Sequence, residues 1–112
     1  MQYRKRLASL ITLLLLSMAV MLFPGNRPPV ANAGYDRYVA YDMIQLDGSD
    51  SFDPEAVALS YRWNQLSGPS LTISGNETAT PTVSAFIPGD SVQHCQFELT
   101  VSDGFLESKD QV

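Results

Sequence analysis

The stretch Leu46–Gln65, LDGSDSFDPEAVALSYRWNQ, contains the pattern that decides the fold. Its first part is an acidic, serine-rich loop, and its second part alternates between apolar and polar residues. In that second part Leu59, Tyr61 and Trp63 occupy every second position, so they share one face of a β-strand. A strand with a tryptophan on one face needs a second layer to cover the ring. The stretch therefore predicts a layered β-structure.

A second alternating strand is predicted over His94–Ser102, with apolar side chains at its odd-numbered positions and polar ones between them. We expect these two strands to supply the core residues Tyr61, Trp63, Phe97, Leu99 and Val101. Shorter strands are expected over Val30–Gly34, Arg37–Tyr41, Met43–Asp47, Leu71–Ser74 and Thr80–Phe86, with a last, shortened strand after the turn Asp103-Gly104. About seven short strands separated by such turns are typical of an all-β, two-sheet sandwich.

Residues 1–23 have the composition of a targeting segment. Three basic residues, Arg4 to Arg6, precede the run Leu7–Phe23, which contains no charged residue and is expected to form a hydrophobic helix. The length of this run is at the lower limit of about 17 residues that a helix needs to cross a bilayer. Small side chains also precede a potential cleavage point after Ala19. Cleavage as a signal peptide and retention as a membrane anchor therefore both stay open. Either way the remainder is exported, to the extracellular space, the cell surface or the periplasm.

Residues 24–28 are a proline-rich linker, and residues 29–112 are the expected domain. After residue 23 the chain has 12 acidic and 4 basic residues, a net charge of −8. This charge argues against nucleic acid as a partner, because the phosphates would be repelled. Contact with a membrane is expected only through the N-terminal segment, if that segment is not cleaved. Cys95 is the only cysteine, so no internal disulfide is expected, and we interpret it as a small buried hydrophobe.

Four separate pieces, in order, resemble the PKD domain, an immunoglobulin-like sandwich. They are Pro29–Gly34 (PVANAG), Leu46–Pro54 (LDGSDSFDP), Leu59–Trp63 (LSYRW) and Phe97–Gly104 (FELTVSDG). The resemblance implies display outside the cell or at its surface, contact with a protein or carbohydrate ligand, and spacing of neighbouring domains. In such a sandwich we expect Trp63 to pack on Phe97 and Leu99 from the facing sheet, and we expect Gly34 and Gly48 to adopt positive φ.

The resemblance also implies a calcium site. PKD-like domains that bind calcium use positions matching Asn32, Asp53 and Asp103, with the acid at Glu55 as an addition, and such oxygen ligands suit Ca²⁺. The loops before the Trp63 strand and after the Phe97 strand should lie at the same end. The pattern departs at Asp53–Val57, DPEAV, where the family usually has Asp-Pro-Asp-Gly-Asp. The alternative is that these acids cap backbone N–H groups without a metal.

Tyrosines cluster on or beside the short strand expected at Arg37–Tyr41. Tyr35 and Tyr41 would point to one side and Tyr38 to the other. An exposed pair of Tyr35 and Tyr41 is a candidate surface for a sugar or a protein. The alternative is that the rings cover a sheet edge.

No catalytic site is expected. His94 and Cys95 are neighbours on a strand and point to opposite faces, so they do not form a dyad. No phosphate loop or nucleophile elbow is present. The sequence predicts a noncatalytic exported module for contact and spacing at the amino end of a longer protein. The alternatives are an accessory domain of a secreted protease or glycosidase, and a calcium-stiffened linker.

Overall fold

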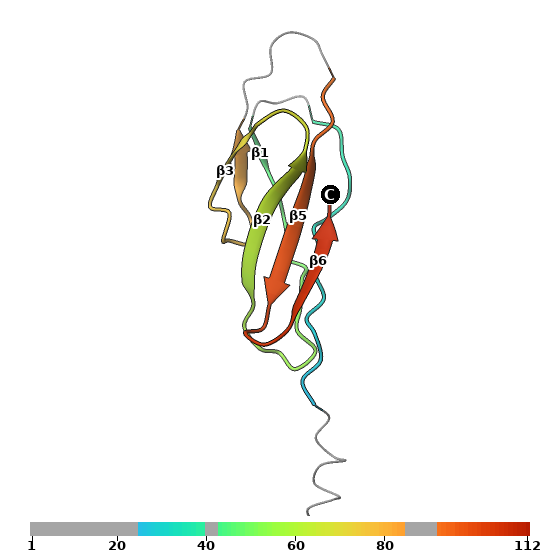
Figure 1. Ribbon diagram of the computed structural model, residues 1–112, viewed down its shortest axis with the longest axis vertical. Coiled ribbons are helices and arrows are strands. Elements are labelled where there is room, and N and C mark those ends of the chain that lie inside the picture. Colours follow the sequence, from blue (N-terminus) through green and yellow to red (C-terminus); the bar gives the residue numbers. More distant parts are fainter. Residues whose placement is uncertain (1–24, 40–42, 85–91) are drawn as a thin grey trace, which may run out of the picture.

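The part of the chain that the structure describes folds into six strands in two three-stranded antiparallel sheets (Figure 1). The computed structural model describes residues 25–39, 43–84 and 92–112. One sheet has the order β1-β4-β3 and the other β2-β5-β6. The strand bounds are β1 Met43–Gln45, β2 Ser60–Ser67, β3 Thr72–Ser74, β4 Thr82–Ser84, β5 Gln96–Ser102 and β6 Glu107–Gln111. The predicted all-β, two-sheet architecture is confirmed, whereas the hydrophobic helix predicted within residues 1–23 lies outside the described residues.

The core lies between the two sheets. The register of β2 and β5 places Trp63 opposite Leu99 and Tyr61 opposite Val101 within one sheet. The prediction that Leu99 and Phe97 cover Trp63 from the facing sheet is therefore wrong, because β2 and β5 are hydrogen-bonded neighbours. The other layer contributes Val83 to the buried cluster, whose members are Ala33, Leu46, Trp63, Val83, Phe97, Leu99 and Val101. Tyr61 and Cys95 are half-buried against its margin.

One of the expected strands does not form as a strand, and the described part of another does not join a sheet. Val30–Gly34 makes a single antiparallel bridge, between Val30 and Phe52. Beyond it, side chains of β6 replace the backbone ladder: Ala31 N–H donates to Ser108 Oγ at 2.8 Å, and Ala33 N–H donates to Asp110 Oδ2 at 2.7 Å. The described residues 37–39 of the second expected strand are not extended into a sheet. The sandwich thus has six strands in its described part rather than about seven.

A glycine is needed at position 48 because a larger side chain has no room there. The predicted positive φ is not observed at Gly48. A Cβ atom there would lie 2.7 Å from Leu99 Cδ2 and 3.3 Å from the Ala79 carbonyl oxygen. Gly34 does have positive φ, at 85°. Gly48 therefore marks the point where the acidic loop passes directly over the core of the β2-β5-β6 sheet.

No helix that is long and apolar enough to cross a bilayer occurs within residues 25–39, 43–84 and 92–112.

Candidate functional site

The acidic loop and the β5–β6 turn meet at one end of the sandwich. Because β2 begins where β5 ends, with Ser60 paired to Ser102, the loop 49–59 and the turn 103–106 lie side by side. The chain enters the domain at this same end (Figure 1). We call this region, made of residues 25–29, 49–59 and 103–106, the N-terminal end. It contains the carboxylates that the sequence analysis singled out.

Asp103 is buried and fully engaged in hydrogen bonds. Its Oδ1 accepts from the backbone N–H groups of Leu106, at 2.7 Å, and Phe105, at 2.8 Å, and its Oδ2 accepts from Asn26 Nδ2 at 2.7 Å. The bond from Leu106, followed by those from Asn26 and Phe105, holds the pKa of Asp103 below its ordinary value. Asp103 therefore closes the β5–β6 turn as an ionised cap.

Asp53 lies beside Asp103, and interaction between the two carboxyl groups also lowers the Asp103 pKa. Asp53 Oδ1 accepts from the backbone N–H of Glu55 at 2.9 Å and of Val57 at 3.2 Å. Asp53 Oδ2 is buried and has no hydrogen-bond partner. Asp53 is only 8% and Asp103 only 6% exposed, so the two carboxyl groups share a confined space.

The other two predicted ligands do not join this pair. Asn32 Oδ1 accepts from its own neighbour, Gly34 N–H, at 2.9 Å. The Glu55 carboxylate accepts from Arg27 Nε at 2.8 Å in an exposed ion pair. Within the described ranges no three Asp, Glu, His or Cys side chains group closely enough to hold a metal ion. The structure brings together two of the four residues, Asp53 and Asp103. Backbone N–H groups bond to the Oδ1 atom of each, and the Asn26 side chain bonds to Asp103 Oδ2.

The linker contributes contacts that composition did not reveal. Asn26 and Arg27 fasten the entering chain to Asp103 and Glu55, one on each loop of the N-terminal end. Their sequence neighbours are proline and glycine, which indicated only a spacer. A signal was available in principle, because a lone basic residue before an acidic loop is a candidate ion-pair partner.

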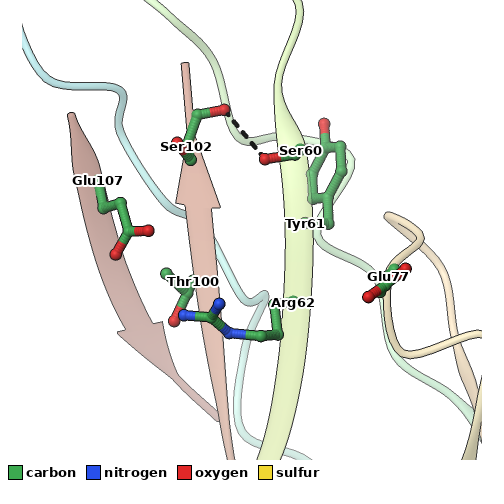
Figure 2. A pocket seen from close by; sticks show the side chains of 7 residues that line it. All are labelled: Ser60, Tyr61, Arg62, Glu77, Thr100, Ser102 and Glu107. Carbon is green, nitrogen blue, oxygen red and sulfur yellow. Dashed lines mark hydrogen bonds between the residues drawn. The ribbon is translucent and has the colours of Figure 1, made fainter. Parts of the chain in front are cut away.

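A second candidate surface is an open depression of about 340 Å³ on the β2-β5-β6 sheet (Figure 2). Figure 2 shows the Arg62 side chain extending across Thr100, with Ser60 and Ser102 above them. Thr100 is buried, and its Oγ1 has no hydrogen-bond partner. The lining combines hydroxyl, guanidinium and carboxylate groups: Ser60, Tyr61, Arg62, Glu77, Thr100, Ser102 and Glu107. Sequence alternation places Ser60, Arg62, Thr100 and Ser102 outward but does not show that they border a hollow.

The tyrosine surface is described only in part. Tyr35 and Tyr38 are each 94% exposed, so neither ring covers a sheet edge, and Tyr41 lies outside the described residues. Arg37, between them, donates from its guanidinium to the Gln45 carbonyl at the end of β1. His94 is exposed and Cys95 is half-buried against the core, just before β5. Gly68 approaches closely here, since a Cβ on it would lie 3.0 Å from Cys95 Sγ.

Residues 33–112 match the family described as K319L-like, PKD domain. The chain belongs to this family. The human dyslexia-associated protein KIAA0319 is 38% identical over 81 residues, which are 70% of this chain and 7% of that protein. The chain thus spans a small fraction of the length of the curated relative that it matches.

Two solved structures are similar to this PKD domain. The PKD domain from KIAA 1837 protein has a TM-score of 0.59 and 28% identity, covering 80% of this chain and 86% of that one. A nucleoside hydrolase-related hypothetical protein from Saccharophagus degradans has a TM-score of 0.62 and 23% identity, covering 79% of this chain and 25% of that one. The second likeness concerns the fold alone.

Proposed function

We propose that this PKD domain is a noncatalytic, exported module that contacts a protein or carbohydrate ligand and spaces its neighbours at the cell surface. The observation that carries the proposal is the exposed face of the β2-β5-β6 sheet, with its polar depression around Arg62 and Thr100. Hydroxyl, guanidinium and carboxylate groups in a shallow site suit a hydroxylated ligand, because each donor and acceptor finds a counterpart.

The direction of the chain supports the spacing role. The chain enters at the N-terminal end, and β6 runs away from that end toward Val112 (Figure 1). A segment joined after Val112 would therefore leave from the other half of the sandwich. Domains linked in this way extend in series rather than folding back on one another.

Arg62 offers a direct test of the contact surface. We expect Arg62→Ala to weaken binding to immobilised polysaccharides or to whole cells by about tenfold, the effect of losing about 1.4 kcal/mol of contact energy. Lys109→Ala is the matched control, because Lys109 is also a cation on this sheet but pairs with Glu98 at 3.2 Å outside the depression. Equal losses of binding in the two variants would show that positive charge on the sheet, rather than the depression, determines binding. If the unmodified chain binds no polysaccharide or cell, the proposed contact function is wrong.

A calcium-stiffened form of the module is a second candidate, favoured by the unpartnered Asp53 Oδ2 beside Asp103. The Asp53 and Asp103 carboxylates would supply some of the oxygen ligands that Ca²⁺ requires. Backbone or water oxygens would have to complete its coordination shell. Calcium should then raise the thermal midpoint of the unmodified chain, and a chelator should reverse the rise. Asp53→Asn should abolish the rise. An unchanged midpoint with calcium in the unmodified chain would remove the ion from this proposal.

A further inference from the structure

Apolar side chains are exposed at the N-terminal end. Phe105, at the top of the β5–β6 turn, is 89% exposed, and Leu106 and Val57 are also exposed. These three residues are held in one place, because the carboxyl pair accepts their backbone N–H groups: Val57 donates to Asp53, and Phe105 and Leu106 donate to Asp103. We call Val57, Phe105 and Leu106 the apolar tip. A nearly fully exposed phenylalanine in such a group indicates a surface that is covered in another setting.

The entering chain is fastened at the same place. Asn26 is bonded to Asp103 and Arg27 to Glu55, so the linker cannot swing away from the tip without breaking both contacts. Asn26 follows Phe23, the last residue of the uncharged run Leu7–Phe23, by three positions. Three extended residues reach at most about 10 Å. Wherever that run is held, the apolar tip lies within a short distance of it.

Charge at the tip is lower than the acidic sequence suggests. Asp53 and Asp103 are turned inward and buried, and Arg27 pairs with Glu55, so Asp50 and Glu107 are the exposed carboxylates that remain on these two loops and at the start of β6. The exposed Phe105 is therefore flanked by leucine and valine, and the carboxyl groups that cap these loops, Asp53 and Asp103, are directed away from it into the fold. Such side chains partition favourably into the boundary between lipid headgroups and acyl chains. The net charge of −8 after residue 23 disfavours an anionic surface and leaves a zwitterionic one.

We propose that the apolar tip contacts the interface of a zwitterionic bilayer in which the run Leu7–Phe23 is retained. This inference rests on the anchored form of the proposed exported module. It differs from the sequence-based expectation that membrane contact involves the N-terminal segment alone. The domain then sits with its N-terminal end on the lipid and its β2-β5-β6 depression facing sideways, above the headgroups.

A tryptophan placed in the tip tests the contact. The full chain with Phe105→Trp is reconstituted into phosphatidylcholine vesicles, with Tyr38→Trp as the matched control at an equally exposed aromatic position outside the tip. We expect brominated acyl chains to quench the Phe105→Trp emission at least twofold more than the Tyr38→Trp emission, with a shift to shorter wavelength. The unmodified chain, whose single Trp63 is buried, supplies the background signal.

Vesicle flotation separates the two ways in which the inference fails. If the chain floats with the vesicles but Phe105→Trp is no more quenched than Tyr38→Trp, the tip contact is overturned while the anchor stands. If the chain does not float, the retained anchor and the tip contact are both overturned. Neither result affects the ligand contact proposed for the sheet, which is measured by Arg62→Ala.

Discussion

The two sheets of the sandwich differ in how they are held. In the β2-β5-β6 sheet, strands of 8, 7 and 5 residues form long ladders, whereas each strand of the β1-β4-β3 sheet has 3 residues. Trp63 joins the two: its backbone N–H donates to the Asn76 carbonyl at 2.8 Å, and its ring Nε1 donates to the Thr78 carbonyl at 3.1 Å. The comparison teaches that the short sheet depends on the long one, through the Trp63 contacts with the loop 76–78 and through the core that Val83 shares with the long sheet.

The largest expected effect lies inside the long sheet. Leu99 is fully buried opposite Trp63, so Leu99→Ala should lower the free energy of unfolding by about 3–5 kcal/mol through lost burial and a residual cavity. Ile73→Ala, in half-buried β3 at the edge of the short sheet, should cost about half as much or less. Urea denaturation followed by Trp63 fluorescence measures both. Equal costs would contradict the dependence of the short sheet on the long one.

The contact between loop and core is the next most sensitive point. Gly48→Ala should destabilise the fold by about 1–3 kcal/mol, because the new methyl group meets Leu99 Cδ2 and the backbone at Ala79. Gly25→Ala is the control, since a Cβ there meets nothing within 4 Å. Urea midpoints of the two variants test this, and a Gly48→Ala protein as stable as Gly25→Ala would show that the loop shifts freely.

Asp103 should make the stability of the β5–β6 turn in the long sheet depend on pH. Its pKa is lowered in the folded state, so its stabilisation is complete above the unfolded value of about 3.9 and is lost as the pH falls through the folded pKa. Asp103→Asn should therefore flatten the acid limb of a plot of stability against pH. Asp47 also has a lowered pKa, from bonds with Ser49, and Asp47→Asn should leave the Asp103 contribution in place. Identical acid limbs for the unmodified chain and Asp103→Asn would exclude this role.

The smallest effect is expected in the loop that connects the two sheets. Ala56 has φ of 59°, a left-handed conformation that glycine adopts without strain. Ala56→Gly should stabilise the fold by less than about 1 kcal/mol, since relief of strain exceeds the added entropy of the unfolded chain by little. Ala58→Gly, a nearby exposed position without positive φ, should destabilise it instead. Thermal midpoints with the same sign for both variants would contradict this.

The long sheet was predictable from the sequence, and the short sheet only in outline. Alternation over Leu59–Gln65 and His94–Ser102 determines which side chains face the core, because the period of two acts along a single strand. Alternation does not determine which strands pair, so Trp63 and Leu99 were placed in different sheets although they are neighbours. Val30–Gly34 has a strand-like composition, but side chains of β6 take up its N–H groups.

The candidate site shows the same limit. The approach of Asp53 and Asp103 follows from the loop positions, and the structure places them together. The positions of Asn32 and Glu55 depend on partners that no local pattern encodes: a glycine N–H two residues away and an arginine in the linker. The depression around Thr100 needs the lateral order of three strands, which only the tertiary structure supplies.

The attachment of the first segment to β6 has a mechanical consequence. Ala31 meets Ser108 and Ala33 meets Asp110, so the two segments run in the same direction side by side. Tension applied between residue 25 and residue 112 would slide them along each other and load both bonds at once, rather than opening them one by one. One hydroxyl and one carboxylate therefore contribute to the resistance of the domain to stretching, and substitution at Ser108 or Asp110 should lower it.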